Sequence, residues 1–410
     1  MRSWTTPIAE GEHRRDGTTT VALVVLAQVF HGLTFSGIAM FLPLIRADLQ
    51  ITFSQAGLLS AAATFSYAVG QVPAGYLSDR YGPKRLFFFG LLGWSTLSLT
   101  LGLVHLFWLA LLNQLVAGAF RALLFAPGMS LLVSWFKPER RATAMSLYMV
   151  GGFAGTIVLS LLGPWLAHEL GWRTTFMMLA GLGIAASLAY RRYAKDRPAR
   201  EAAKHARLAE AIVLFRHPIL WVCSAIQFIR FTVVTAVNFW LPTLLVADRG
   251  FTLQEAGFVT AMSAAFIAPS NTVGGYVSDR LKNPPLVIGA SLAILACGAT
   301  LLVTVKSVVA LLMVVVLMSV FLQFYFGSLF LVPMEVLGQR TAGMATGIAN
   351  LFANVGGFLT AYVLGVVKDH AGSFKWGFVG VSVMCVVGVA LSVVLARMRT
   401  HALRVQPAAA

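Results

Sequence analysis

Twelve long apolar segments, separated by short polar intervals, dominate this chain of 410 residues. Each has about the 20 residues that a helix needs to cross the hydrocarbon core of a bilayer. Backbone groups find no water in that core, so each segment must hydrogen-bond its own backbone, as a helix does. The segments lie at 20–45, 55–77, 86–104, 107–134, 143–163, 174–191, 217–246, 255–277, 286–304, 308–333, 343–366 and 377–396. This pattern predicts an all-α membrane protein with twelve transmembrane helices.

The composition excludes other classes. Hydrophobic residues make up 58% of the chain and charged residues 11%, whereas soluble domains have about 25% charged residues. The net charge of +16 lies in short clusters between apolar segments, which argues against nucleic-acid binding. Cys223, Cys297 and Cys385 fall in apolar segments without metal-ligand spacing. We find no phosphate loop, zinc motif or catalytic triad spacing, so we expect no metal, no cofactor and no enzyme.

The lysines and arginines indicate the orientation in the membrane. With the N-terminus inside, the cytoplasmic segments hold 23 of the 31 Lys and Arg residues and the outer loops hold 6. Positive charge accumulates on the cytoplasmic side of membrane proteins. The distribution therefore predicts a multi-pass protein of the inner (plasma) membrane, embedded in the lipid bilayer, with both termini in the cytoplasm.

The sequence repeats at half its length. FSQAGLLSAAATF at Phe53 matches LQEAGFVTAMSAAF at Leu253, and GYLSDR at Gly75 matches GYVSDR at Gly275, both with the same offset. Internal duplication is typical of transporters built from two bundles. We expect a cytoplasmic tail at 1–19, a six-helix bundle at 20–190, a cytoplasmic linker at 191–216, a second six-helix bundle at 217–396 and a cytoplasmic tail at 397–410.

A charged turn follows the second apolar segment. It reads GYLSDRYGPKR and resembles the loop signature of the major facilitator superfamily, G-x-L-x-D-R-x-G-x-K-R. The resemblance implies twelve helices in two pseudo-symmetric bundles, and a gate in which the aspartate latches a neighbouring helix end in the outward-facing state. The alternative is a plain turn with cytoplasmic charges. The candidate gating residues are Gly75, Asp79, Arg80, Gly82, Lys84 and Arg85, with Asp279 and Arg280 in the degenerate second copy.

Further strings narrow the resemblance. SYAVGQVPAGYLSDR, WFKPERRATAMS, GWRTTF and ATGIANLFANVGGF are similar to the anion:cation symporter family, which carries organic anions. The helix-7 arginine of that family stands twelve residues before a proline, as Arg230 stands before Pro242. The place of its helix-4 arginine is Gln114 here, and Arg121 stands where the family often has a glutamate. That departure puts carboxylate-based proton coupling in doubt.

Two arginines lie inside apolar segments, Arg121 in the fourth and Arg230 in the seventh. A charge at this depth costs about 2.5–3.5 kcal/mol on insertion scales, and no Asp or Glu lies mid-segment to neutralise it. An anionic substrate would supply the missing charge, because the planar guanidinium matches a carboxylate bidentately. One arginine from each half also suits a site at the midplane. The alternative is that one of them reaches the interface or bonds backbone carbonyls.

Other residues are candidates for orienting the substrate or coupling its transport. His31 is the histidine that lies well inside an apolar segment, and it could bind a coupling proton or simply pack. Aromatic residues in the tenth segment would suit an apolar acid, but packing explains them equally well. The remaining candidate substrate-binding residues are Asn238, Gln323, Tyr325, Asn350 and Asn354.

These features predict a monomeric secondary transporter of a small organic anion, most simply a monocarboxylate. It would work by alternating access. Entry of an anion is opposed by a negative-inside potential, by about 2.3 kcal/mol per charge per 100 mV. Proton symport would offset this cost, and anion exchange or uniport are alternatives. A multidrug/proton antiporter of the same fold is a further alternative, but it would need an embedded acid that this chain lacks.

Overall fold

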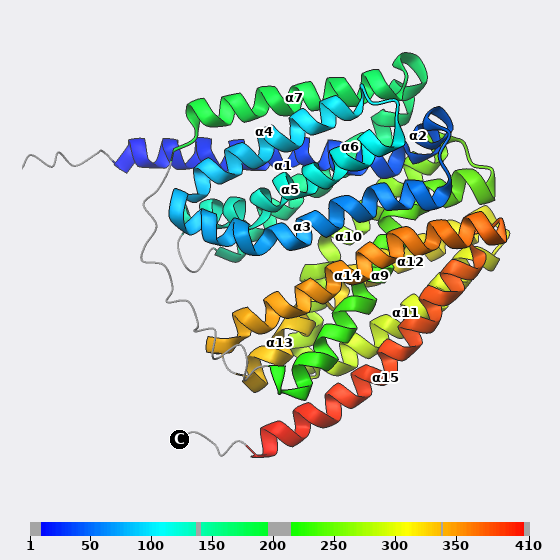
Figure 1. Ribbon diagram of the computed structural model, residues 1–410. Coiled ribbons are helices and arrows are strands. Elements are labelled where there is room, and N and C mark those ends of the chain that lie inside the picture. Colours follow the sequence, from blue (N-terminus) through cyan, green and yellow to red (C-terminus); the bar gives the residue numbers. More distant parts are fainter. Residues whose placement is uncertain (1–9, 137–140, 196–214, 338, 406–410) are drawn as a thin grey trace, which may run out of the picture.

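A computed structural model describes residues 10–136, 141–195, 215–337 and 339–405, and these residues form helices joined by short turns (Figure 1). The helices of the N-terminal half are α1 (Glu10–Met40), α2 (Leu42–Leu49), α3 (Phe53–Tyr81), α4 (Pro83–Leu101), α5 (Phe107–Ser134), α6 (Arg141–Leu170) and α7 (Trp172–Tyr193). Those of the C-terminal half are α9 (Pro218–Arg249), α10 (Leu253–Leu281), α11 (Pro284–Thr304), α12 (Val308–Phe324), α13 (Phe326–Leu337), α14 (Gln339–Ala371) and α15 (Lys375–Val405).

The prediction of twelve membrane-spanning helices is confirmed. α2 is a short continuation of α1 on the other side of Phe41, and α12 and α13 together form one span interrupted at Tyr325. Among the described residues, eight spans are long and apolar enough to cross a membrane by length and composition alone, and α3, α4, α7 and α10 are not among these eight. Most of the predicted linker, 196–214, lies outside the described residues, as does 137–140 of the WFKPERR string.

Matching helix starts show the duplication in atomic detail. Thr52 accepts a hydrogen bond from the Gln55 backbone N–H, and the Gln55 side chain accepts one from the Thr52 N–H. Thr252 and Glu255 form the same capping box at the matching position of the second half. Such boxes satisfy N–H groups that the first helical turn leaves unpaired. The same capping motif therefore begins α3 and α10.

A second matched pair fastens the last helix of each half. Asp48 accepts hydrogen bonds from the Trp172 indole N–H at 2.9 Å and the Arg173 Nε–H at 2.7 Å, which ties α2 to α7. Asp248, its counterpart in the second half, forms an ion pair with Lys368 and accepts a hydrogen bond from the Phe374 backbone N–H. In both halves a carboxylate thus holds the turn that leads into the final helix.

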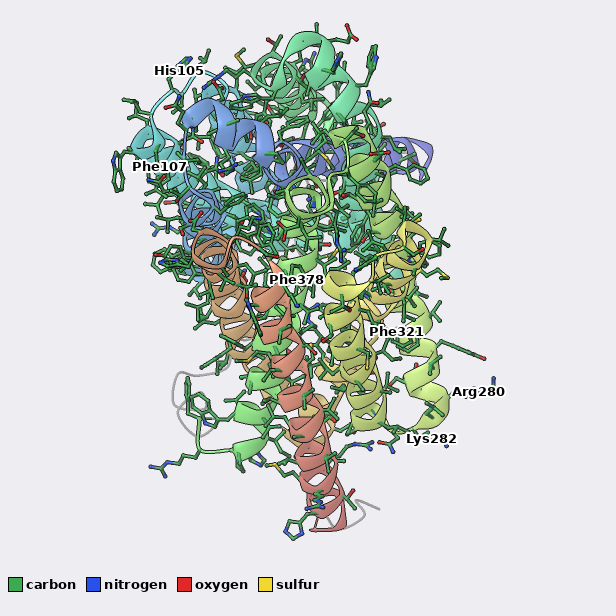
Figure 2. All side chains as sticks on the ribbon, turned by 90° about the vertical axis from the view of Figure 1, so that its right-hand side faces the viewer. His105, Phe107, Arg280, Lys282, Phe321 and Phe378 are labelled. Carbon is green, nitrogen blue, oxygen red and sulfur yellow. The ribbon has the colours of Figure 1, made fainter. Side chains whose placement is uncertain are left out.

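The chain direction defines two faces of the molecule. α1 begins and α15 ends on one side, here called the terminus face, and α3, α10 and α15 begin on the opposite side, here called the far face (Figure 1). In Figure 1 the two halves lie together at the far face and separate toward the terminus face. Figure 2 shows the far face toward the viewer, with His105 and Phe107 in one half and Phe321 and Phe378 in the other.

Glycines explain how closely the halves approach at the far face. A Cβ on Gly57 of α3 would lie 2.1 Å from the carbonyl oxygen of Ala361 in α14, and one on Gly365 would lie 2.3 Å from that of Phe53. A Cβ on Gly257 of α10 would likewise lie 2.2 Å from the Ser160 carbonyl oxygen of α6. No real side chain tolerates such contacts, so these backbones meet because the side chains are absent.

The glycine of the repeated GYxSDR string behaves differently. Outside its own turn of the helix, no described atom lies within 4 Å of a Cβ built on Gly75, and the same holds for Gly275. Both glycines stand near the terminus face, where the halves are apart. In this conformation neither glycine therefore marks a close approach to another described helix.

Candidate functional site

A cavity of ≈ 240 Å³ lies between the two halves, lined by residues of α1, α3, α4, α5 and α6 on one side and of α9, α10 and α14 on the other. Drug-sized ligands occupy pockets of about 300–1,000 Å³, so this volume suits a smaller molecule. Arg121 is the charged residue among the described residues that line it. The cavity therefore combines a small size with one positive charge.

Arg121 is positioned on α5 by two aromatic rings. Its guanidinium carbon lies 4.1 Å from the ring centroid of Phe35 in α1 and 4.4 Å from that of Tyr67 in α3. Rings stack on the flat faces of a guanidinium and leave its in-plane N–H groups available. No described residue forms an ion pair or a hydrogen bond with those N–H groups. The side chain is thus fixed in place while its hydrogen-bonding fork stays open to a ligand.

Polar side chains surround this arginine within the cavity. Gln114 lies two helical turns before Arg121 on the same face of α5, as the helical period requires, and both line the cavity. Asn238 and Asn354 approach from the C-terminal half. The Asn354 amide donates to the Asn350 carbonyl oxygen at 2.8 Å, whereas Asn238 makes no hydrogen bond with a described residue and is exposed in the cavity.

Arg230 is not part of the cavity lining in this conformation. It is 3% exposed on α9, and its Nε–H and Nη1–H donate to the Gln227 and Gln323 side-chain oxygens, both at 2.8 Å. Its guanidinium also lies 4.7 Å from the Phe326 ring centroid. Two neutral amides therefore satisfy part of its fork. Phe231, the next residue, does line the cavity, so Arg230 lies behind that wall.

His31 lies beside the arginine site but not in the cavity lining. Its ring stacks on Phe35 at 5.8 Å and meets the edge of Trp94 at 5.2 Å. Phe35 therefore contacts both His31 and Arg121. The Nε2 atom of His31 is buried without a hydrogen-bond partner among the described residues. An unpaired buried ring nitrogen has an unfilled place for a donor, an acceptor or a proton.

The other predicted substrate-binding residues have structural contacts. The Asn350 amide donates to the Gln71 side-chain oxygen at 3.0 Å, which joins α14 to α3 across the two halves. Tyr325 is fully buried at the break between α12 and α13, and its hydroxyl has no described partner. Neither residue lines the cavity. The structure thus gathers Arg121, Asn238 and Asn354 in one site and leaves His31, Arg230, Gln323, Tyr325 and Asn350 outside its lining.

The candidate gating residues lie at the terminus face. Gly82 has φ of 87° and serves both as the end of α3 and the start of α4, which explains why glycine is needed in the turn. Arg80 and Arg85 are exposed, and Lys84 is half-buried. Asp79 is in α3, but its side chain lies outside the described part of the structure. Asp279 and Arg280 are exposed, and Figure 2 shows Arg280 at the edge of the C-terminal half.

The two rings that hold Arg121 were not predicted from the sequence. Phe35 lies four residues after His31 and so lies on the same face of the helix. This spacing could have indicated that Phe35 lies beside His31. Tyr67 lies in the SYAVGQVPAG string, where nothing local distinguishes it from a packing tyrosine. Their common role depends on the packing of α1, α3 and α5, which no single segment shows.

Comparison with known proteins identifies the family. The sequence model described as the Major Facilitator Superfamily matches residues 24–361. A probable galactarate/D-glucarate transporter of Escherichia coli (strain K12) is 24% identical over 387 residues, which cover 83% of this chain and 84% of that protein. The hexuronate transporter of Bacillus subtilis (strain 168) is 24% identical over 392 residues, covering 89% and 91%. A probable sulfoacetate transporter of Cupriavidus necator is 25% identical over 374 residues, covering 83% and 85%.

Solved structures show the same fold. A bacterial homologue of the human lysosomal transporter Spinster, in an inward-facing and unoccupied conformation, superposes with a TM-score of 0.77 at 17% identity, covering 95% of this chain and 97% of that one. The similar proteins are named as transporters, in agreement with the prediction that this chain is not an enzyme. Because the family model spans most of the chain and the fold agrees, this protein is a multi-pass membrane transporter that belongs to the Major Facilitator Superfamily.

Proposed function

We propose that this protein is a secondary transporter of a small organic anion with one carboxylate. The observation that carries the proposal is the free guanidinium fork of Arg121 in the central cavity, with no acidic residue among the described lining residues. A carboxylate would accept two parallel N–H bonds from that fork. Relatives named for galactarate/D-glucarate, hexuronate and sulfoacetate support an anionic substrate. Asn238 and Asn354 would contact the bound anion from the other half.

The conformation fits alternating access. We propose that the terminus face is cytoplasmic, as the excess of Lys and Arg there indicates, and that the protein lies in the plasma membrane as a monomer. With the halves joined at the far face, the structure then represents an inward-facing state. Rocking of α1–α7 against α9–α15 would expose Arg121 to the two sides in turn. Arg230 would add positive potential behind Phe231 without donating to the anion.

We propose that the anion enters with a proton carried by His31. The ring contacts Phe35, which also contacts Arg121, so a proton at the unpartnered Nε2 lies one side chain away from the anion site. Symport of one proton with a monovalent anion is electroneutral and removes the opposition of the membrane potential. Exchange of one anion for another would need no proton, so only symport would require His31.

Substitution of His31 separates these modes. We expect His31→Asn to abolish uphill, pH-gradient-driven accumulation in proteoliposomes while exchange of labelled for unlabelled anion continues at near wild-type rate. Asn keeps a polar group of similar size but cannot take up a proton near neutral pH. The measurement is accumulation with an acidic exterior, beside counterflow without a gradient. Unchanged accumulation by His31→Asn would show that the coupling proton binds elsewhere or is not needed.

A binding panel tests the proposed function itself. Purified protein would be screened by thermal shift against carboxylates, amines and neutral sugars, since a ligand that binds only the folded state raises the melting temperature. We expect carboxylates to stabilise the wild type and amines and sugars to have no effect. Stabilisation by amines or neutral sugars, with none by carboxylates, would overturn the proposal.

A further inference from the structure

The cavity walls also constrain the part of the anion that does not carry the charge. We infer, on the basis of the proposed anion site, that the substrate has an apolar or aromatic body rather than a polyhydroxylated one. A polyhydroxylated acid needs a protein or water partner for every hydroxyl that it buries, because an unpaired buried hydroxyl costs about 1–3 kcal/mol. The hydrogen-bond donors and the apolar surface of the cavity lining therefore determine whether a polyhydroxylated or an apolar substrate fits better.

Several lining hydroxyls already donate within the protein. Ser319 donates to the Val315 carbonyl oxygen at 2.6 Å, so in its contact with Ser263 at 2.7 Å the donor is Ser263. Thr64 donates to the Ser60 carbonyl oxygen and Thr260 to that of Ala256. The protons of these hydroxyls are therefore not available to a sugar, and only their oxygens could accept a hydrogen bond.

The same internal pairing continues in α1, α5 and α6. Thr156 donates to the Gly152 carbonyl oxygen, so Ser36 is the donor in the 2.6 Å contact between Ser36 and Thr156. The Gln114 amide donates to the Asn113 side-chain oxygen at 3.1 Å. The Gln114 side-chain oxygen, the Ser160 hydroxyl and the Asn238 amide line the cavity without a described hydrogen-bond partner. These groups can serve a few polar substituents but not a hydroxyl on every carbon of the substrate.

The wall contributed by the C-terminal half is mainly apolar. Phe231, Val234, Val237 and Phe239 of α9 and Ile267 of α10 line the cavity. Trp94 and Phe153 line it from the N-terminal half, in addition to the Phe35 ring. Transfer of apolar surface from water to such walls is favourable by about 25 cal/mol per Å². A flat ring or branched chain joined to the carboxylate would gain free energy by burial against this surface. The hydroxyls of a polyol would instead lose their hydrogen bonds to water there.

A competition assay tests this inference. Benzoate and a branched aliphatic acid would be compared with a hexuronate and glucarate in thermal shift and calorimetry on the wild type. We expect the apolar acids to bind at least tenfold more tightly. Equal or tighter binding of the sugar acids would overturn the inference and leave the proposed anion transport intact. Binding by none of these acids would contradict both.

A variant pair checks that the wall causes the preference. Phe231→Gln adds an amide to the apolar wall, whereas Phe231→Leu keeps the wall apolar at a smaller size. We expect the preference for apolar acids to fall severalfold in Phe231→Gln and to remain in Phe231→Leu. An unchanged preference in Phe231→Gln would argue against the role of this wall.

An independent observation concerns the junction at the far face. Asp369, near the end of α14, accepts hydrogen bonds from the backbone N–H of Phe53 at 2.9 Å, the backbone N–H of Ser54 at 2.7 Å and the Ser54 hydroxyl at 2.5 Å. These groups open the first turn of α3, which belongs to the other half. A carboxylate at a helix N-terminus fills unpaired N–H groups and is stabilised by the helix dipole.

We infer that Asp369 is a latch that holds the far face closed. Its contacts are present only while α3 and α14 meet there, so opening the far face must break all three. Asp79 stands at the opposite end of the same helix pair, where the family resemblance implies a latch for the opposite state. The two carboxylates would then stabilise alternate states of one transporter, each from the C-terminal end of its helix.

The surroundings of Asp369 are consistent with an ionised carboxylate. Lys368 and Arg46 lie in the same surface hollow. Lys368 forms an ion pair with Asp248 of its own half, and the guanidinium of Arg46 lies 4.0 Å from the Phe53 ring centroid. Glu169 occupies the equivalent position in the first half, at the end of α6, yet its carboxylate contacts the adjacent His168. Only one of the two pseudo-equivalent carboxylates therefore bridges the described parts of the halves.

Cysteine labelling from the far face tests the latch. Ala39→Cys places a thiol in the cavity wall, in a background with Cys223, Cys297 and Cys385 replaced by alanine. We expect Asp369→Ala to raise the labelling of this thiol by an impermeant maleimide about tenfold, because loss of a cap of this kind typically changes an equilibrium by about that factor.

Two further variants make the test specific. Ser54→Ala, which loses one of the three donors, is expected to give a smaller rise. Glu169→Ala, at the pseudo-equivalent position, is expected to give none. Unchanged labelling in both Asp369→Ala and Ser54→Ala, or an equal rise in Glu169→Ala, would overturn the latch.

Discussion

Arg121→Gln is expected to abolish measurable substrate binding while leaving the protein folded. Truncation of one partner of a buried charge pair typically costs 2–5 kcal/mol, or about 30-fold to more than 1,000-fold in affinity. The new glutamine would keep a polar side chain near Phe35 and Tyr67 but would lose the charge and the fork that these rings hold. The measurement is the dissociation constant of a stabilising carboxylate by calorimetry.

Arg230→Gln is the matched control for that experiment. The Arg230 fork is already engaged by Gln227 and Gln323, so its removal should weaken anion binding by about tenfold or less, through lost potential alone. Arg121→Lys should give intermediate binding, because an ammonium keeps the charge without the planar fork. Equal losses in Arg121→Gln and Arg230→Gln would mean that both arginines contact the anion in the transport cycle.

Gly57→Val is expected to stop transport by opening the far face. Even the first carbon of the new side chain would lie 2.1 Å from the Ala361 carbonyl oxygen and 3.1 Å from the Trp240 ring. Because the first of these atoms is helix backbone, α3 and α14 must separate, which removes the conformation described here. We expect the labelling of Ala39→Cys from the far face to approach completion and uptake to fall to background.

Gly75→Val is the control on the same helix. Outside its own turn of α3, no described atom lies within 4 Å of a Cβ at that position, so valine there should not open the far face. The labelling of Ala39→Cys should therefore not rise above the wild-type level. If Gly75→Val raised labelling as much as Gly57→Val, the effect would reflect general loss of packing in α3 rather than the far-face junction.

Much of the fold was predictable because the bilayer requires each spanning helix to be apolar over a fixed length. The length and apolar character of each segment predicted twelve spans, and the internal repeat predicted two matching halves. The capping boxes at Thr52 and Thr252 were not predicted, but they lie at matching positions of the repeat. The helix ends were less predictable. α1 begins at Glu10, ahead of the predicted start at residue 20. The apolar stretch marks only the part of the helix that lies in the hydrocarbon core, and the helix itself continues beyond it.

The candidate site was only partly predictable. Arg121 was identifiable because placing a charge inside an apolar segment costs free energy, so such a residue indicates a functional site. Arg230 stood out for the same reason, yet its oxygen partner Gln323 lies 93 residues away in sequence. The contact depends on how α9 packs against α12. The far-face latch was also hidden, since Asp369 and Ser54 are 315 residues apart and neither is unusual in its own segment.

Uptake by proteoliposomes tests the central claim most directly. Vesicles containing wild-type protein or Arg121→Gln would be given a labelled carboxylate chosen from the binding panel, with unlabelled carboxylates, amines and neutral sugars as competitors. We predict saturable uptake by the wild type that only carboxylates inhibit, and background uptake by Arg121→Gln. Undiminished uptake by Arg121→Gln, or inhibition by amines or neutral sugars instead of carboxylates, would contradict an anion site at Arg121.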